Sequence, residues 1–399
     1  MKAPRKIYTW TSILLFVCCS LIFLSCEKEE LGEAMENRKT LFMFLPWSTD
    51  LTGYFYTNIA DMEACVSRRG LEHERILVFM STSSTEATMF EIIHSKGKCD
   101  RKTLKRYGTS GFTTVEGITG ILNDVQEFAP APVYAMIIGS HGMGWLPVDG
   151  TQADSLFRMK KHWEYQEQPL TRYFGGLTRE FQTDVGTLAR GIVGAGVKME
   201  YILFDDCYMS CMEVAYDLKD ATDYIIASTS EVMDKGMPYH RIYKHLMATE
   251  PNYQAVCDNF YDYYTNYSAP YGTIGVTDCR YMDEMVAIMK YINTKHTFDT
   301  DRLNNVQDLD GETFTPTIFF DFDDYVRNLC TNDNNTYEQF NAVLQRLVPY
   351  KANTNYIFSG NTQRETKVNH FSGITISDPS TRSEIKESKK YTNWWIQTH

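Results

Sequence analysis

The sequence is short of basic residues and lacks the cysteine patterns of small zinc or disulfide modules. Lys and Arg number 39 against 51 Asp and Glu, which gives the 399 residues a formal net charge of −12. Non-specific nucleic-acid binding needs a basic surface, so we expect no nucleic-acid partner. The chain has no Cys-x-x-Cys pair, no His at finger spacing from Cys207 and Cys211, and no internal repeat. Zinc modules and repeat solenoids are therefore excluded, and the 43% hydrophobic content indicates a globular protein.

The N-terminus has the features of a secretory signal. Three basic residues among the first six precede an apolar run at 13–24, and Ser25 and Cys26 follow. The segment Phe23-Leu-Ser-Cys26 resembles a bacterial lipobox, which implies cleavage before Cys26 and lipidation of this residue. The acidic stretch after it resembles the export tag of surface lipoproteins. We therefore expect an exported protein anchored by lipid to a bacterial membrane, at the outer membrane or cell surface. An uncleaved anchor is the alternative, because residues 7–24 are near the lower length limit for a membrane span.

Strands and helices are predicted to alternate along most of the chain. Short apolar runs without a polar face are typical of parallel strands covered on both sides, and they occur at 41–45, 75–80, 134–138, 201–204 and 224–227. Helical spacing is found at 118–125, 188–193, 212–218 and 282–292. Further strands are expected at 272–276 and 370–376, and further helices at 319–329 and 336–347. This order predicts an α/β fold with a mostly parallel, doubly wound sheet flanked by helices.

Two of the predicted strands end at residues suited to nucleophilic chemistry. The strand 134–138 is followed by a Gly-Ser-His-Gly segment containing His141, and the strand 201–204 is followed by Asp-Asp-Cys, ending at Cys207. Ligands bind beyond the carboxyl ends of strands in an open parallel sheet, so neighbouring strands would place both side chains in one crevice. A helix is expected directly after Cys207. Its N-terminus and the nearby imidazolium would lower the pKa of the thiol.

Acyl transfer is the interpretation that these residues favour. A thiolate beside an imidazole is the minimum equipment for that chemistry, and the backbone N–H groups of Gly142 and Cys207 are the predicted oxyanion donors. One alternative is that His141 and Cys207 are an ordinary loop residue and an inert core residue. Another is that both bind a metal ion together with Asp205.

The two motifs resemble those of the clostripain family of cysteine peptidases. The resemblance is carried by IIGSHGMGW at 137–145 and LFDDCYMSCMEVAY at 203–216, with weaker pieces at 228–239, 319–322 and 371–379. It extends from about residue 41 to 379. It implies the caspase-like fold of clan CD, with His141 as the catalytic histidine and Cys207 as the nucleophile of a cysteine endopeptidase.

The resemblance also implies cleavage after Arg or Lys in protein or peptide substrates, through an acidic S1 pocket. Asp205 stands two residues before Cys207, where the family has a pocket acid. Glu231 and Asp234 follow the strand 224–227 and are the candidates for a second acid. Asp206 stands where many relatives have a small residue, and is expected either to point inward or to cap the following helix.

A long connection at 145–183 comes directly after the His141 motif. Connections of roughly forty residues are uncommon unless they are functional or disordered. Family members are often self-cleaved in this loop, so the resemblance implies processing here, and the candidate sites are Arg158, Lys160, Lys161 and Arg172. A solvated basic loop that is never cut is the alternative.

The expected organisation is a lipoprotein signal peptide at 1–25, an acidic tether at 26–40, a catalytic core at 41–295 and a C-terminal part of the same peptidase unit at 296–399. No metal and no cofactor are expected, and the sequence leaves calcium dependence open. Two other functions stay open. One is a binding lipoprotein that keeps the fold without turnover, and the other is a different Cys-His acyl transferase or amidase.

Overall fold

The computed structural model describes residues 37–48, 50–108, 111–146, 175–176 and 181–399. The chain divides into two units, 1–36 and 37–399, and only the second is described below. The predicted signal peptide and Cys26 lie outside the described residues, as does most of the predicted tether.

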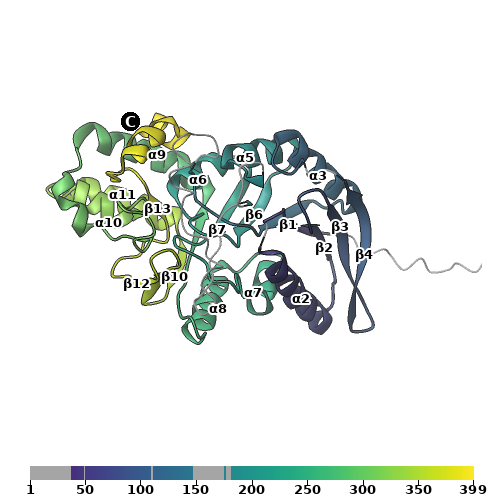
Figure 1. Ribbon diagram of the computed structural model, residues 1–399. Helices are drawn as coiled ribbons and strands as arrows, with labels where there is room; N and C mark the ends of the chain where they lie inside the picture. Colours follow the sequence, from purple (N-terminus) through teal and green to yellow (C-terminus); the bar gives the residue numbers. More distant parts are fainter. Residues whose placement is uncertain (1–36, 49, 109–110, 147–174, 177–180) are drawn as a thin grey trace, which may run out of the picture. The chain divides into compact units, whose positions relative to one another are not determined.

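A nine-stranded sheet runs through the described part of the chain (Figure 1). Its strands are β1 (Lys39–Leu45), β2 (Glu74–Ser81), β3 (Ala87–Ser95), β4 (Lys98–Tyr107), β5 (Val133–Ile138), β6 (Met199–Phe204), β7 (Thr222–Ala227), β8 (Thr273–Asp278) and β10 (Tyr350–Asn353). Their order in space is β10-β8-β7-β6-β5-β1-β2-β3-β4. The strands from β7 to β2 are parallel, and those at both ends are antiparallel.

The central strands are apolar because both of their faces are buried. In β1, Leu41, Met43 and Leu45 pack in one layer of the core, and Phe42 and Phe44 pack in the other. Successive side chains of a strand point to opposite faces, so a strand covered on both sides needs an unbroken apolar run. The edge strand β4 is mostly exposed and rich in Lys and Arg, which protects an edge against pairing with another chain.

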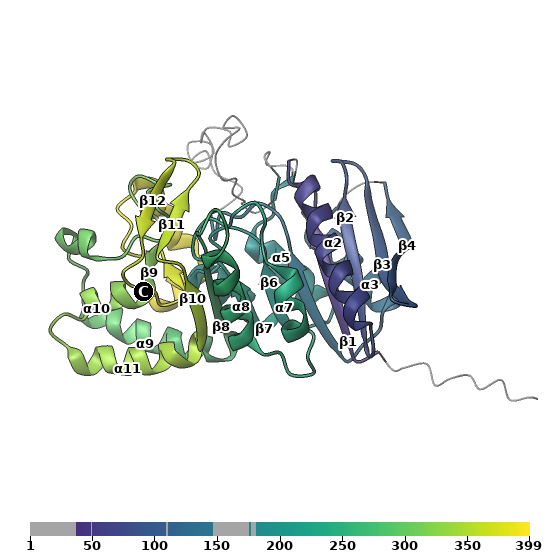
Figure 2. The ribbon, with the colours of Figure 1, turned by 90° about the horizontal axis from the view of Figure 1, so that it is seen from below.

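Helices cover the sheet on both faces (Figures 1 and 2). One face carries α3 (Val115–Phe128), α5 (Val185–Gly194) and α6 (Met212–Leu218), and the other carries α2 (Thr52–Arg69), α7 (Tyr239–Leu246) and α8 (Tyr253–Thr265). Each turns an apolar stripe to the sheet, as Ile118, Ile121 and Val125 do in α3. Among the described residues, no helix is both long enough and apolar enough to cross a membrane.

The chain after β8 adds further helices and two small sheets. The helices are η3 (Cys279–Tyr281), α9 (Met282–Lys295), η4 (Thr300–Asn305), α10 (Phe322–Leu329), α11 (Asn334–Leu347), α12 (Ser383–Ser388), η5 (Lys389–Tyr391) and α13 (Asn393–Thr398). The small antiparallel sheets pair β9 (Phe320–Asp321) with β13 (Thr375–Ile376), and β11 (Tyr356–Ser359) with β12 (Arg364–Lys367). Thr375 donates its N–H to the Ser210 carbonyl at 2.9 Å. The C-terminal part therefore supports the chain just beyond Cys207.

The predicted α/β fold with a mostly parallel sheet is confirmed, and some details differ. β8 is antiparallel to β7, because two consecutive helices, α7 and α8, bring the chain back to the same end of the sheet at which β7 finishes. The strand expected at 370–376 is only the two-residue β13. The helix expected at 319–329 begins at Phe322, because the Asp321 carboxylate caps it by accepting the Asp324 N–H at 3.0 Å. The hairpin β3–β4 was not predicted: β4 is charged and exposed, and Glu91 interrupts the buried apolar residues of β3.

Candidate active site

The segments that follow β5 and β6 are in direct contact. The two strands are parallel neighbours, so both segments emerge at the same edge of the sheet. A Cβ atom on Gly142 would stand 2.3 Å from the Cys207 carbonyl oxygen and 2.8 Å from the Cys207 nitrogen. The backbones therefore approach closely at a position that only glycine allows. Both His141 and Cys207, which the sequence places in one crevice, are buried, at 3% and 1% exposed.

Asp206 ties these two segments together. Its carboxylate is fully buried and accepts the Ser140 backbone N–H at 2.5 Å and the Ser140 hydroxyl at 3.3 Å. Ser140 Oγ also accepts the Gly175 N–H at 3.0 Å. Of the two roles expected for Asp206, the inward one is found, and the residue holds the His141 segment in place.

Cys207 does not lie at a helix N-terminus, so that expectation is wrong. The helix α6 begins at Met212, with Cys211 in the capping position, because the chain first passes through a turn and an extended segment. The N–H group directed at the sulfur comes from elsewhere: Val232, in the segment after β7, donates to Cys207 Sγ at 3.2 Å. A donor at this distance stabilises a thiolate more than a thiol.

Tyr208 makes the turn that presents Cys207. It adopts a left-handed backbone conformation with φ of 59°, which costs a non-glycine residue about 1 kcal/mol or more. Its ring stacks on Phe319 with centroids 5.1 Å apart. Its hydroxyl donates to Glu231 Oε1 at 3.0 Å. Burial, followed by the charge of Glu231, raises the pKa of Tyr208 well above its ordinary value, so the hydroxyl stays protonated and able to donate.

The candidate S1 acid Asp205 is buried beneath the segment after β7. Its carboxylate is 1% exposed and accepts the Met237 N–H at 2.8 Å and the Tyr239 hydroxyl at 2.9 Å. Gly236 packs so closely that an added Cβ would stand 2.3 Å from Asp205 Oδ1. Asp205 therefore helps to shape the segment that also carries Glu231 and Asp234.

The other two candidate acids differ in their surroundings. Glu231 is 5% exposed, and its carboxylate accepts the Thr313 hydroxyl at 2.6 Å and the Gly360 N–H at 3.0 Å, besides Tyr208. Asp234 is only half-buried. Burial and then the charge of Asp234 raise the pKa of Tyr267 to about 12. Glu231 is thus hydrogen-bonded to residues of the C-terminal part of the chain, whereas Asp234 lies near Tyr263 and Tyr267.

A residue outside the predicted set contacts His141. Asp50 Oδ1 lies 2.7 Å from His141 Nε2, and its side chain is 36% exposed. Asp50 follows β1, which neighbours β5 on the side away from β6. Ligands bind beyond the carboxyl ends of parallel strands, so the loop after the predicted strand 41–45 was a place to look for a further site residue. Nothing in the sequence singles out Asp50 within this loop.

Both described ends of the long connection after His141 lie at this site. Trp145 donates its indole N–H to Ser377 Oγ at 2.7 Å. At the other end, the Gly175 carbonyl accepts the His141 N–H at 3.4 Å. The candidate processing residues lie between these ends, outside the described residues: Arg158, Lys160, Lys161 and Arg172.

Apart from Cys99, which lies in the edge strand β4 and so at the far side of the sheet from β5 and β6, the other cysteines of the described ranges are poor nucleophiles. Burial raises the pKa of the thiols of Cys65, Cys211, Cys257, Cys279 and Cys330. Within the same ranges, no group of three or more His, Cys, Asp or Glu is placed to hold a metal ion. Nucleophilic chemistry is therefore expected at Cys207.

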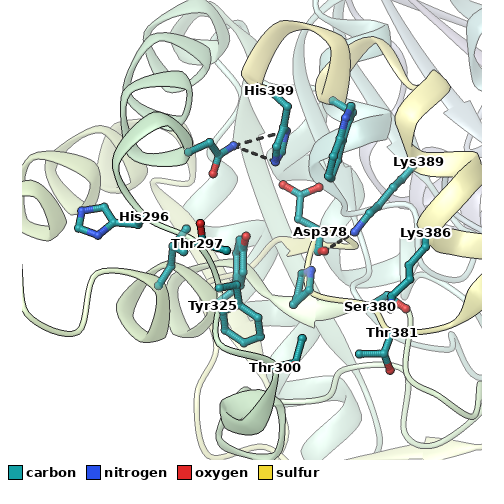
Figure 3. Close-up of a pocket in the computed structure, with 15 residues that line it drawn as sticks. His296, Thr297, Thr300, Tyr325, Asp378, Ser380, Thr381, Lys386, Lys389 and His399 are labelled. Carbon is teal, nitrogen blue, oxygen red and sulfur yellow. Dashed lines mark hydrogen bonds between the residues drawn. The ribbon is translucent and has the colours of Figure 1, made fainter.

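A separate cavity of about 300 Å³ opens among the C-terminal helices (Figure 3). Lys389 donates from Nζ to the backbone carbonyl of Asp378 at its wall. Burial raises the pKa of the Asp378 carboxyl to about 6. The lining contains neither His141 nor Cys207 nor any of the S1 candidates, so this cavity is distinct from the site described above.

Comparison with known proteins identifies relatives over most of the chain. A family model described as "Clostripain family" matches residues 46–345. Among solved structures, a secreted C11 cysteine protease from Bacteroides thetaiotaomicron called iotapain is 51% identical. The match covers 91% of this chain and 99% of that one, with a TM-score of 0.83.

Two further structures extend this similarity. A clostripain from Bacteroides thetaiotaomicron, in complex with the peptide inhibitor BTN-VLTK-AOMK, is 54% identical over 57% of this chain and 99% of that one, with a TM-score of 0.54. An inactive zymogen C11 protease from Parabacteroides distasonis is 26% identical over 92% of this chain and 99% of that one, with a TM-score of 0.76. No match was found among curated proteins.

Proposed function

Because the chain belongs to the clostripain family and is a cysteine protease, we propose that it is an endopeptidase that cleaves after Arg or Lys with Cys207 as nucleophile and His141 as acid and base. The observation that carries this proposal is the packing of Gly142 on the Cys207 backbone. It brings together the two strand-end segments that hold a thiol and an imidazole, which are the groups needed for acyl transfer.

In the proposed mechanism, His141 takes the proton of Cys207 and the thiolate attacks the scissile carbonyl carbon. The oxyanion of the tetrahedral intermediate is bound by the N–H groups of Cys207 and Gly142. His141 then gives the proton to the departing amine, leaving a thioacyl bond at Cys207 that water hydrolyses. The Val232 N–H at 3.2 Å from Sγ supports the thiolate before attack.

For specificity, we propose that Asp205 is the main S1 acid, with Asp234 and Glu231 contributing to the same negative field. A buried P1 cation needs a carboxylate partner, and Arg can bind one bidentately. Asp205 precedes Cys207 by two residues, and Asp234 stands two residues before the Gly236 that contacts Asp205. The inhibitor of the Bacteroides relative carries K next to its AOMK group, which supports a basic P1 residue here.

The proposal is tested by hydrolysis of matched fluorogenic amides with Arg, Lys or a neutral residue at P1. The purified mature chain is expected to turn over the basic substrates at least about 100-fold faster in kcat/KM than the neutral one, since a desolvated charge pair is worth about 3 kcal/mol. Equal rates on all substrates would contradict the proposed specificity. Transfer of the acyl group to added amines in preference to water would favour the transferase alternative.

We further propose that the chain is exported, lipidated at Cys26 and cut by its own activity between residues 145 and 183. Purified wild-type protein should then run as fragments of about 15 and 26 kDa, at about 110 Da per residue, whereas Cys207→Ala stays in one piece. Intact-mass measurement locates the cut among Arg158, Lys160, Lys161 and Arg172. A wild-type enzyme that is fully active but uncut would contradict activation by cleavage and leave the protease assignment in place.

A further inference from the structure

A carboxylate from outside both sequence motifs is directed at the imidazole of His141. Asp50 Oδ1 lies 2.7 Å from Nε2, within the range of a charge-assisted hydrogen bond. The two residues are 91 positions apart in the chain. We propose that Asp50 is the positioning residue for His141, an inference that rests on the proposed roles of His141 and Cys207.

The fold holds Asp50 in this position from two sides. β1 and β5 are parallel neighbours, and Gly139 donates its N–H to the Phe44 carbonyl at 3.1 Å where the two strands end. Asp50 itself donates its N–H to the Ser48 carbonyl at 2.8 Å. The next residue, Leu51, is 3% exposed and leads directly into α2. The backbone of Asp50 is thus anchored, so its carboxylate is held towards the ring.

This contact selects one tautomer of the imidazole. With Nε2–H donating to Asp50, Nδ1 is the nitrogen that accepts the proton from the Cys207 thiol and later returns it to the leaving amine. The carboxylate stabilises the imidazolium formed between those two steps. Titratable groups also stand on the segment after β6 that packs here: Asp206, which accepts from Ser140, Cys207 itself, and Asp205, whose carboxylate accepts from Met237 and Tyr239.

The expected effect is moderate because Asp50 is 36% exposed. Water screens a carboxylate at this exposure, so its contribution is smaller than the roughly 10⁴-fold of a fully buried acid in a serine protease triad. We expect Asp50→Asn to lower kcat/KM on the preferred basic amide by about 10-fold to 100-fold. Asp50→Glu, which restores the charge on a longer arm, should recover most of this loss.

The pH profile separates positioning from a merely structural role. A neighbouring carboxylate raises the pKa of an imidazolium, so its removal lets the ring lose its proton at lower pH. The alkaline limb of the kcat/KM profile should therefore move to lower pH in Asp50→Asn. A loss of activity with an unshifted profile and a lowered melting temperature would instead mark a structural contact and overturn the inference.

Asp61→Asn is the matched control. Asp61 lies on α2, and its Oδ2 is 3.1 Å from His240 Nδ1. Its side chain is 39% exposed, close to the 36% of Asp50, and it is likewise paired with a histidine. It has no role in the proposed mechanism. This variant should keep wild-type kcat/KM and the wild-type pH profile.

A second readout keeps the test independent of peptide hydrolysis. Alkylation of Cys207 by iodoacetamide, followed by mass spectrometry between pH 5 and pH 9, measures the thiolate directly, and Cys207→Ala is the blank. Asp50→Asn should alkylate about 10-fold more slowly near pH 6.5, because the imidazolium that stabilises the thiolate is weakened. Alkylation rates equal to those of wild type would overturn the inference. A protein that hydrolyses no peptide but shows this difference would refute the proposed substrate and keep the role of Asp50.

Discussion

Replacing Cys207 by Ala is expected to reduce hydrolysis of basic fluorogenic amides by several orders of magnitude, to below a few per cent of wild type. The substitution removes the atom that forms the thioacyl bond, and in an enzyme of this type the loss of the nucleophile cannot be offset by the oxyanion donors. The measurement is kcat/KM of the purified variant, with its melting temperature recorded alongside.

The Cys207→Ala variant should still fold, with a slightly lower free energy of unfolding than wild type. The Val232 N–H loses its sulfur acceptor, and a buried donor without a partner costs about 1 to 3 kcal/mol. Cys207→Ser keeps a hydrogen-bond acceptor for the Val232 N–H. It should be as inactive as Cys207→Ala but more stable than that variant. Cys211→Ala is the matched control, since that thiol is also buried and lies four residues further on. Activity retained in Cys207→Ala, or lost equally in Cys211→Ala, would remove Cys207 from the nucleophile role.

The second large effect is expected from Asp205→Asn. This variant should lose about 3 kcal/mol in kcat/KM, or about 100-fold, on Arg substrates, because the P1 cation loses its charged partner in a buried site. Neutral substrates should be affected little. The measurement is the ratio of kcat/KM for Arg and neutral P1 residues in the variant and in wild type.

A structural role of Asp205 can be tested separately. The Tyr239 hydroxyl donates to Asp205 Oδ2 at 2.9 Å, so Tyr239→Phe removes this bond and leaves the charge in place. We expect this control to lower the melting temperature while the Arg-to-neutral ratio is kept. Equal losses of Asp205→Asn on charged and neutral substrates would show that Asp205 only shapes the segment at Gly236 and Met237.

Much of the architecture could be predicted from local patterns. The strands at 41–45, 134–138 and 201–204 are unbroken apolar runs, and the structure contains them because side chains on both faces of a central strand are buried. Because the carboxyl ends of neighbouring parallel strands meet at one edge of a sheet, His141 and Cys207 could then be predicted to lie at the same edge. These predictions succeeded because each depends on the residues of a single element and on the order of elements.

Other features depend on contacts between distant parts of the chain. The helix predicted at 212–218 is present as α6, but Cys207 was wrongly expected at its N-terminus. Tyr208 first turns the chain with a positive φ, which its stacking on Phe319 stabilises. The hairpin β3–β4 was missed, because β4 is an exposed, charged edge strand without an apolar period, and Glu91 interrupts the apolar residues of β3. The burial of Asp205 under Gly236 also could not be read from spacing.

The sequence by itself determined the α/β class, the central parallel strands, and the two segments that carry the thiol and the imidazole. Only the tertiary structure decided which groups surround them: Asp50 at His141 Nε2 and the Val232 N–H at Cys207 Sγ. The physical reason is that these two kinds of interaction act over different separations along the sequence. Burial and backbone propensity act over a few neighbouring residues and leave a period in the sequence, whereas a hydrogen bond between segments 91 or 25 positions apart leaves no local pattern.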